Sequence, residues 1–156
     1  MAVHEAVGDT IDLYLVQFYN QGQETRYDSY NELFISSTGS VWSKTAVKDL
    51  KDRGIPLQKI VVGKPVTEAD AANTGTVPLD DLGSWTTRAY NELGWYGGIM
   101  FWQFKSDTDY SAITKAIGNV VTLYRQDNGI SDDNSGEENP TPTPEPTPEP
   151  TPEPQP

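Results

Sequence analysis

Two short polar segments hold the residues of this sequence best suited to chemistry. Gln17-Phe18-Tyr19-Asn20 ends a nearly continuous apolar run, and Trp102-Gln103 ends another. Tyrosine hydroxyls and asparagine or glutamine amides make directional hydrogen bonds, which suits them to a ligand's amide or hydroxyl group. A tryptophan in such a place can provide a stacking surface for a sugar ring. Both segments also have a plainer structural interpretation. Residues 17–20 are also compatible with a strand that runs into a polar loop, and Trp102 with a tryptophan of the core.

Few other residues are candidates for acid–base, nucleophilic or metal chemistry. The acidic pair Asp80 and Asp81 precedes a predicted helix, where carboxylates more often cap the helix than act as acid and base. The same holds for Asp107 and Asp109. The chain has no cysteine and one histidine, His4, which excludes disulfides, thiol catalysis, thiolate zinc sites and histidine metal clusters. We therefore expect no metal and no other cofactor.

The elements that must position these residues follow from the pattern of apolar residues. Apolar runs predict strands over residues 11–18, 60–62 and 98–104, and because they are apolar on both faces we expect parallel strands covered on both sides. Helical spacing predicts helices over residues 40–51, 80–93 and 109–120, with a shorter helical turn at 27–34. Strands that alternate with helices indicate βα units around a parallel sheet, in the α/β class.

Composition divides the chain into a body and a tail. Of 23 acidic residues, eight follow Arg125, so residues 1–125 carry 15 acidic against 11 basic residues, whereas the whole chain has a net charge of −12. Such a charge argues against nucleic acid and anionic membranes as partners. We predict a polar spacer over residues 126–139 and a disordered Pro-Thr-Glu linker over 140–156. The first ten residues lack the basic start and apolar stretch of a secretion signal.

Three motifs together resemble the end of a known catalytic domain. The segments YLVQFYN, IVVGKP and YGGIMFWQF, in this order and spacing, are similar to the last three strands of glycoside hydrolase family 18. The nearest type is the class III, hevamine-like chitinase in a fungal-type variant, and Lys64 stands where the plant-like pattern has leucine. The resemblance covers about residues 9–121. It implies a partial TIM (β/α)8 barrel of about three βα units, strands six to eight, since a complete barrel needs about 250 residues.

The resemblance also implies roles for individual residues. Tyr19 would hydrogen-bond the N-acetyl oxygen of the substrate while that oxygen attacks the anomeric carbon, the substrate-assisted route of this family. Gln17 and Asn20 would line the same cleft, and Trp102 would form its floor under the sugar. The implied partners are chitin or N-acetylglucosamine oligosaccharides and an N-terminal barrel half, with a carbohydrate-binding module after the linker as a further option. The parent family is extracellular, secreted or held in the cell wall.

The catalytic acid of that family has no counterpart in this chain. The family signature Asp-x-x-Asp-x-Asp-x-Glu is approached only by Asp9-x-x-Asp12, and Tyr14 and Val16 then occupy the next required positions. We therefore expect the acid-bearing strand to lie before residue 1, and residues 1–156 alone to be inactive. Two function classes remain open. One is part of a chitinase, and the alternative is a non-catalytic, lectin-like protein that binds chitin or N-acetylglucosamine.

Overall fold

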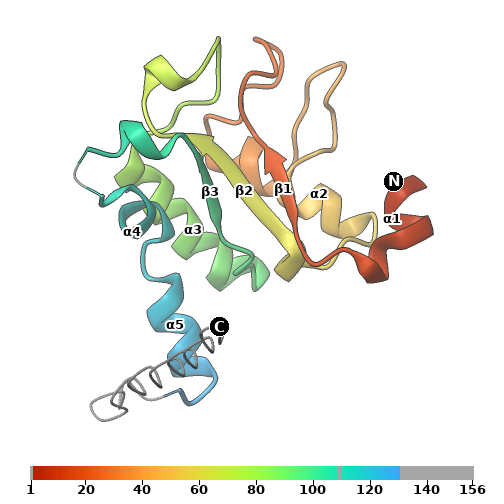
Figure 1. Ribbon diagram of the computed structural model, residues 1–156. Helices are drawn as coiled ribbons and strands as arrows, with labels where there is room; N and C mark the ends of the chain where they lie inside the picture. Colours follow the sequence, from red (N-terminus) through yellow and green to blue (C-terminus); the bar gives the residue numbers. More distant parts are fainter. Residues whose placement is uncertain (1, 109, 131–156) are drawn as a thin grey trace, which may run out of the picture.

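The centre of the computed structural model, which describes residues 2–108 and 110–130, is a parallel sheet of three strands (Figure 1). The strands are β1 (Tyr14–Gln17), β2 (Ile60–Pro65) and β3 (Ile99–Trp102), and β2 lies between the other two. Helical segments separate them along the chain, as the sequence predicts for βα units. Because all three strands run the same way, their carboxyl ends meet at one edge of the sheet, at the top of Figure 1.

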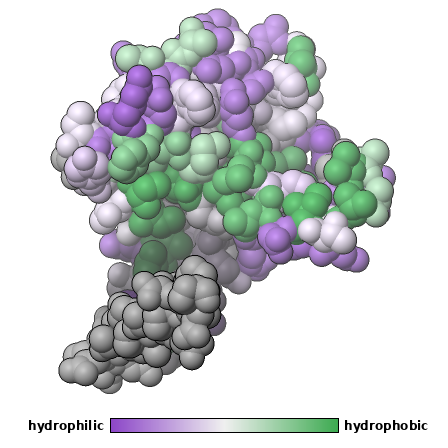
Figure 2. All heavy atoms as spheres, viewed as in Figure 1, coloured by the Kyte–Doolittle hydropathy of each residue, from purple (hydrophilic) through white to green (hydrophobic). Residues whose placement is uncertain are grey.

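The two faces of this sheet have different surroundings. Side chains alternate along a strand, so the register that pairs Val16 with Val62 and Val62 with Ile99 places all three on one face, packed on the helices. The opposite face is open, and there Leu13 and Leu15 are 52% and 61% exposed. Figure 2 shows apolar residues gathered in a band across this face. The prediction that all strands are covered on both sides is therefore wrong for β1, and only β2 is buried throughout.

The longest helix, α3 (Leu79–Leu93), packs behind the sheet and follows the sequence prediction closely. Asp80 and Asp81 lie in its first turn, where acidic side chains interact favourably with the helix dipole. Leu82 and Ala89 are fully buried against the core. The helix ends at Gly94, which takes a left-handed conformation with φ of 71° that glycine adopts without strain.

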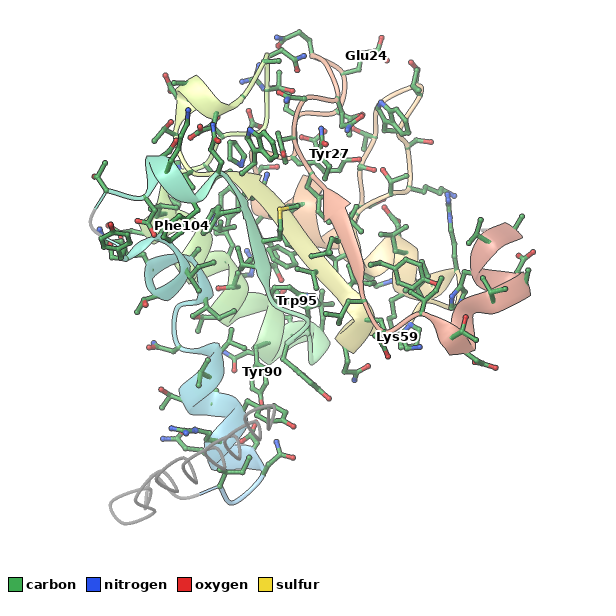
Figure 3. The ribbon with its side chains drawn as sticks, in the orientation of Figure 1. Glu24, Tyr27, Lys59, Tyr90, Trp95 and Phe104 are labelled. Atoms are coloured by element: carbon green, nitrogen blue, oxygen red, sulfur yellow. The ribbon has the colours of Figure 1, made fainter. Side chains whose placement is uncertain are left out.

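The remaining helices are short. Among the described residues they are α1 (Ala2–Val7), α2 (Val47–Asp52), α4 (Ala112–Ile117) and α5 (Val120–Asp127), with a π-helical turn at Asn31–Ile35. Short 3-10 helices lie at Gly8–Thr10, Leu57–Lys59, Glu68–Asp70 and Phe104–Ser106. The π-helical turn overlaps the last four residues of the helical segment predicted for residues 27–34 and ends one residue later. Its buried Leu33 and Phe34, with Trp95 from the segment before β3, form much of the core (Figure 3). The five residues of this turn are thus held by packing more than by intrinsic helix propensity.

The helix predicted from Ser40 begins seven residues late. The Ser40 hydroxyl donates to the Glu24 carboxylate, and so does not cap a helix. Lys44 has a φ of 55°, which is incompatible with an α-helix. The actual helix α2 starts at Val47, where the Asp49 carboxylate accepts a hydrogen bond from the Ala46 amide at 3.2 Å. A contact with a residue 16 positions earlier thus outweighs the local pattern.

The last predicted helix is two helices. Gly118, with φ of 54°, separates α4 from α5. The Asp107 carboxylate accepts hydrogen bonds from the Ser111 and Ala112 amides at the start of α4, both at 3.1 Å. Asp109, the predicted cap, lies outside the described residues. Helix α5 extends to Asp127, two residues into the predicted spacer, and the predicted linker over 140–156 also lies outside the described residues.

Candidate functional site

The predicted site residues lie at the carboxyl edge of the sheet. Gln17 is the last residue of β1, Tyr19 and Asn20 follow it, and Trp102 is the last residue of β3. Gln17 pairs with Gly63, which pairs with Met100, so the alternation of side chains places Gln17, Trp102 and, by extension of β1, Tyr19 on the open face. Trp102 is 53% exposed there. The fold therefore brings a tyrosine and an accessible indole to one side of one edge.

Tyr19 has a buried ring and a hydroxyl group without a partner. The residue is 5% exposed, yet no described residue makes a hydrogen bond to its hydroxyl. Burial raises the pKa of Tyr19, and the nearby negative charge of Asp70 raises it further. The side chain is therefore a neutral hydroxyl near neutral pH, able to donate one hydrogen bond to an acceptor on a ligand.

The two predicted amide residues serve the backbone in this structure. The Gln17 side-chain amide donates to the Tyr19 carbonyl at 3.2 Å. Asn20 has a left-handed φ of 60°, and its side-chain oxygen accepts hydrogen bonds from the Ala72 and Asn73 amides at 2.7 and 3.1 Å. Asn20 thus joins the loop that follows β1 to the loop that follows β2.

Gly75 completes this junction between the two loops. Its φ is 99°, and a Cβ atom added there would lie 2.5 Å from the Tyr19 Cα atom. The backbone of the loop after β2 therefore lies directly against Tyr19, in a place that only glycine can occupy without displacement. The position of Tyr19 is fixed from two sides, by β1 and by this loop.

Asp70, which the sequence analysis does not single out, links the loops after β2 and β3. Its carboxylate accepts hydrogen bonds from the Thr67 hydroxyl at 2.7 Å and from the Ser106 hydroxyl at 2.7 Å, with a longer contact from the Gln103 amide at 3.4 Å. Burial acts to raise the pKa of Asp70, but these hydrogen bonds outweigh it and lower the pKa below its ordinary value. Asp70 is thus a fixed anion beside Tyr19. The spacing Thr67-x-x-Asp70 is the local signal for its bond to Thr67, whereas its contact with Ser106 spans 36 residues.

Lys64 is a buried cation beneath the same edge. It is 1% exposed, and its ammonium group donates to the carbonyls of Phe18 at 3.0 Å, Tyr27 at 2.5 Å and Gly75 at 3.0 Å. These three acceptors satisfy all three ammonium donors. Burial lowers the pKa of Lys64 to about 7, and the charges of Asp28 and Glu32 act in the opposite direction.

Lys64 therefore links three segments around Tyr19. Two of its partners adjoin Tyr19, because Phe18 directly precedes Tyr19 in the chain and Gly75 lies against it. The leucine of the plant-like pattern could make none of these bonds. In the sequence Lys64 stands out as the departure from that pattern, but nothing local indicates its three acceptors.

The described part of the chain shows no sign of a metal centre. No group of three or more histidine, cysteine, aspartate or glutamate side chains within residues 2–108 and 110–130 is placed to hold a metal ion. No described helix is both long enough and apolar enough to cross a membrane. Separately, the groups that the edge presents to a ligand include the Tyr19 hydroxyl and the exposed Trp102 indole.

Comparison with known proteins finds similarity to chitinases, both in sequence and in structure. An acidic endochitinase, SE2, from Beta vulgaris is 30% identical over 105 residues, which are 67% of this chain and 31% of that protein. The crystal structure of a GH18 chitinase from Pseudoalteromonas aurantia superposes with a TM-score of 0.56 and 28% identity, over 74% of this chain and 37% of that one. No family model matches the chain. The chain thus spans about a third of the length of each relative.

Proposed function

Because this chain is related to the GH18 chitinases over about a third of their length, we propose that it forms strands six to eight of a chitinase (β/α)8 barrel. In this assignment β1, β2 and β3 are consecutive barrel strands, and their carboxyl edge is part of the substrate cleft. The parallel order of the three strands and the open face of the sheet support it, since that face would line the barrel interior.

The proposed substrate is a β-1,4-linked chain of N-acetylglucosamine, as in chitin. The Tyr19 hydroxyl donates a hydrogen bond to the acetamide oxygen of one sugar and orients it, while Trp102 lies under that ring. In the whole barrel that oxygen attacks the anomeric carbon as the glycosidic bond breaks, and water then opens the cyclic intermediate with retention of configuration. The leaving oxygen needs a proton from a general acid, and residues 1–156 contain no Asp-x-x-Asp-x-Asp-x-Glu segment to supply it.

One observation carries this proposal. A tyrosine hydroxyl without a protein partner lies on the same face and edge as an indole that is 53% exposed. The Tyr19 hydroxyl is not one of the buried side-chain atoms without a partner, so it reaches the surface of the fold, where a ligand can accept its hydrogen bond. The acetamide and the apolar face of N-acetylglucosamine match the two groups.

The open face also indicates a protein partner within the proposed barrel. Leu13 and Leu15 expose apolar side chains, and within residues 2–108 and 110–130 β1 pairs with a strand on one side only. Covering a few hundred Å² of apolar surface is worth several kcal/mol at about 25 cal/mol per Å². We propose that an N-terminal barrel half of an extracellular chitinase covers this face, and that residues 1–156 alone associate through it.

Binding and turnover of chitotetraose by residues 1–156 test the proposal. We expect weak binding without hydrolysis, a loss of about fivefold in affinity for Tyr19→Phe, and a larger loss for Trp102→Ala. Tyr96→Ala is the matched control, because Tyr96 is an exposed aromatic residue that precedes β3, at the opposite edge. Equal binding by all four proteins would contradict the assignment of the site.

Hydrolysis separates the chitinase from the lectin-like alternative. Turnover by residues 1–156 that Tyr19→Phe abolishes would mean that a substitute acid exists in this chain. If a family 18 N-terminal half supplied in trans restores turnover, the chain is a chitinase part. Saccharide binding that persists without turnover in that mixture would favour the lectin.

A further inference from the structure

A pocket lies at the same edge of the sheet, between the loop that follows β1 and the loop that precedes α2. It has a volume of about 250 Å³, and its walls include Gln21, Glu24 and Thr25 from the first loop and Val41 and Trp42 from the second. Both loops rise from the upper edge in Figure 1, and Glu24 marks the tip of the first in Figure 3. The pocket contains none of the residues assigned above to substrate binding.

The second loop holds two large apolar side chains out in solvent. Val41 is 75% exposed and Trp42 is 43% exposed. Their backbone is nevertheless fixed, because the Ser37 hydroxyl donates to the Trp42 carbonyl at 2.7 Å and the Lys44 amide donates to the Ser37 carbonyl at 2.8 Å. The exposure of Trp42 is thus built into a hydrogen-bonded loop.

The two loops are also tied to each other and to the site at Tyr19. The Ser40 amide donates to the Glu24 carboxylate at 3.1 Å, and the Ser40 hydroxyl donates to the same oxygen. Gln21, which lines the pocket, donates its side-chain amide to the Tyr19 carbonyl at 3.2 Å. Gln21 therefore links the wall of the pocket to the backbone of Tyr19.

The chemistry of the pocket suits a saccharide. An indole offers a flat apolar surface for the C–H face of a sugar ring, and amide and carboxylate groups around it accept or donate hydrogen bonds to hydroxyl groups. Thr25 also lines the pocket, and its hydroxyl, buried beneath the surface, has no hydrogen-bond partner among the described residues. A mixed surface of this kind fits a sugar better than it fits a purely apolar segment of protein.

We propose that Trp42, with Val41 beside it, forms a second saccharide subsite that binds a more distant unit of the same N-acetylglucosamine chain. The inference rests on the proposed function, because it takes the occupant of the Tyr19 and Trp102 site as its starting point. In this proposal a chain of several sugars runs from Trp102 past Tyr19 and Gln21 to Trp42, whereas a disaccharide occupies the first site alone. Trp42 thus gives the cleft its preference for long substrates.

Affinities of residues 1–156 for chitobiose and chitohexaose, measured by calorimetry, test this subsite. We expect Trp42→Ala to weaken chitohexaose binding about tenfold and to leave chitobiose binding unchanged. Trp42→Phe keeps an aromatic face and should retain most of the affinity, which guards against loss of the fold as the explanation. Tyr96→Ala is the matched exposed-aromatic control at the opposite edge and should bind both saccharides normally.

Each outcome separates this inference from the proposed function. Chitohexaose binding that falls with Trp102→Ala but not with Trp42→Ala overturns the subsite and leaves the first site intact. Binding that falls with Trp42→Ala but not with Tyr19→Phe or Trp102→Ala supports the pocket and contradicts the first site. If neither saccharide binds any form, both are overturned. If Trp42→Ala instead abolishes association with an N-terminal barrel half and leaves saccharide binding unchanged, the pocket is a protein contact and the inference is wrong.

Discussion

Replacement of Lys64 by methionine should have an effect on stability that changes strongly with pH. The ammonium group is buried and serves three backbone carbonyls, those of Phe18, Tyr27 and Gly75. Methionine has a similar length and no donor. At high pH, where the folded protein holds a neutral amine, the substitution leaves at least two buried carbonyls without a donor. At roughly 1–3 kcal/mol for each orphaned group, we expect the free energy of unfolding to fall by about 2–6 kcal/mol at pH 10.

At low pH a second effect opposes the first. Burial lowers the pKa of Lys64 from 10.5 to about 7, so the unfolded chain binds more protons than the folded one between these pH values. The wild-type free energy of unfolding therefore rises with pH through this window, by up to about 5 kcal/mol at 1.36 kcal/mol per pKa unit. Methionine carries no charge into the core, so the destabilisation should shrink or reverse at pH 6.

Urea unfolding of both proteins at pH 6, 8 and 10 measures this difference. Lys59→Met is the control, because Lys59 is half-buried and also donates to two backbone carbonyls, those of Gly8 and Ile11, at 3.0 and 2.6 Å. A difference between wild type and Lys64→Met that stays the same from pH 6 to pH 10 would refute the reasoning. If Lys64→Met unfolds at pH 10 with the same free energy as the wild type, the free-energy cost of leaving the carbonyls without a donor is refuted.

Three further predictions concern single contacts at this edge and face. Gly75→Ala should lower the free energy of unfolding by more than about 2 kcal/mol, because it adds a clash with Tyr19 to the strain of a φ of 99°. Gly22→Ala, at a φ of 86° in open space, should lower it by only about 1 kcal/mol. Thermal unfolding measures both, and equal costs would contradict the contact between Gly75 and Tyr19. Thr25→Val should leave stability unchanged or raise it by about 1 kcal/mol, since the hydroxyl has no partner, and a clear loss in urea unfolding would mean that it has one. Leu15→Glu should reduce self-association of residues 1–156 in size-exclusion chromatography, because Leu15 is 61% exposed on the open face, and unchanged association would place the contact elsewhere.

The parts of this fold that are predictable from sequence depend on neighbours along the chain. Helix α3 is one example, because its acidic first turn, its apolar spacing and Gly94 all lie within 16 residues. The helix predicted from Ser40 is wrong since the hydroxyl instead contacts Glu24. The exposure of Leu15 is also not predictable, because an apolar run in the sequence does not indicate which residues cover each face of the strand.

The candidate site divides in the same way. Tyr19 and Trp102 can be identified from their motifs, and the structure places them on one face, although their roles in binding stay predictions. The roles of Asp70 and Lys64 could not be predicted, because the Ser106 contact of Asp70 and the carbonyl contacts of Lys64 span 11 to 46 residues. A cation with three carbonyl partners has no pattern along the chain, and only the packing of loops on the sheet creates it.

The junction at Asn20 has a consequence for motion. The amides of Ala72 and Asn73 lie in an exposed loop but are hydrogen-bonded to the Asn20 side chain, and the Gly75 carbonyl is bonded to Lys64. Exposed loops usually exchange their amide hydrogens quickly, through local fluctuations of small amplitude. Here Ala72 and Asn73 should exchange together with the end of β1, because opening them requires release of Asn20. The loop that lies against Tyr19 therefore belongs to the same cooperative unit as the sheet.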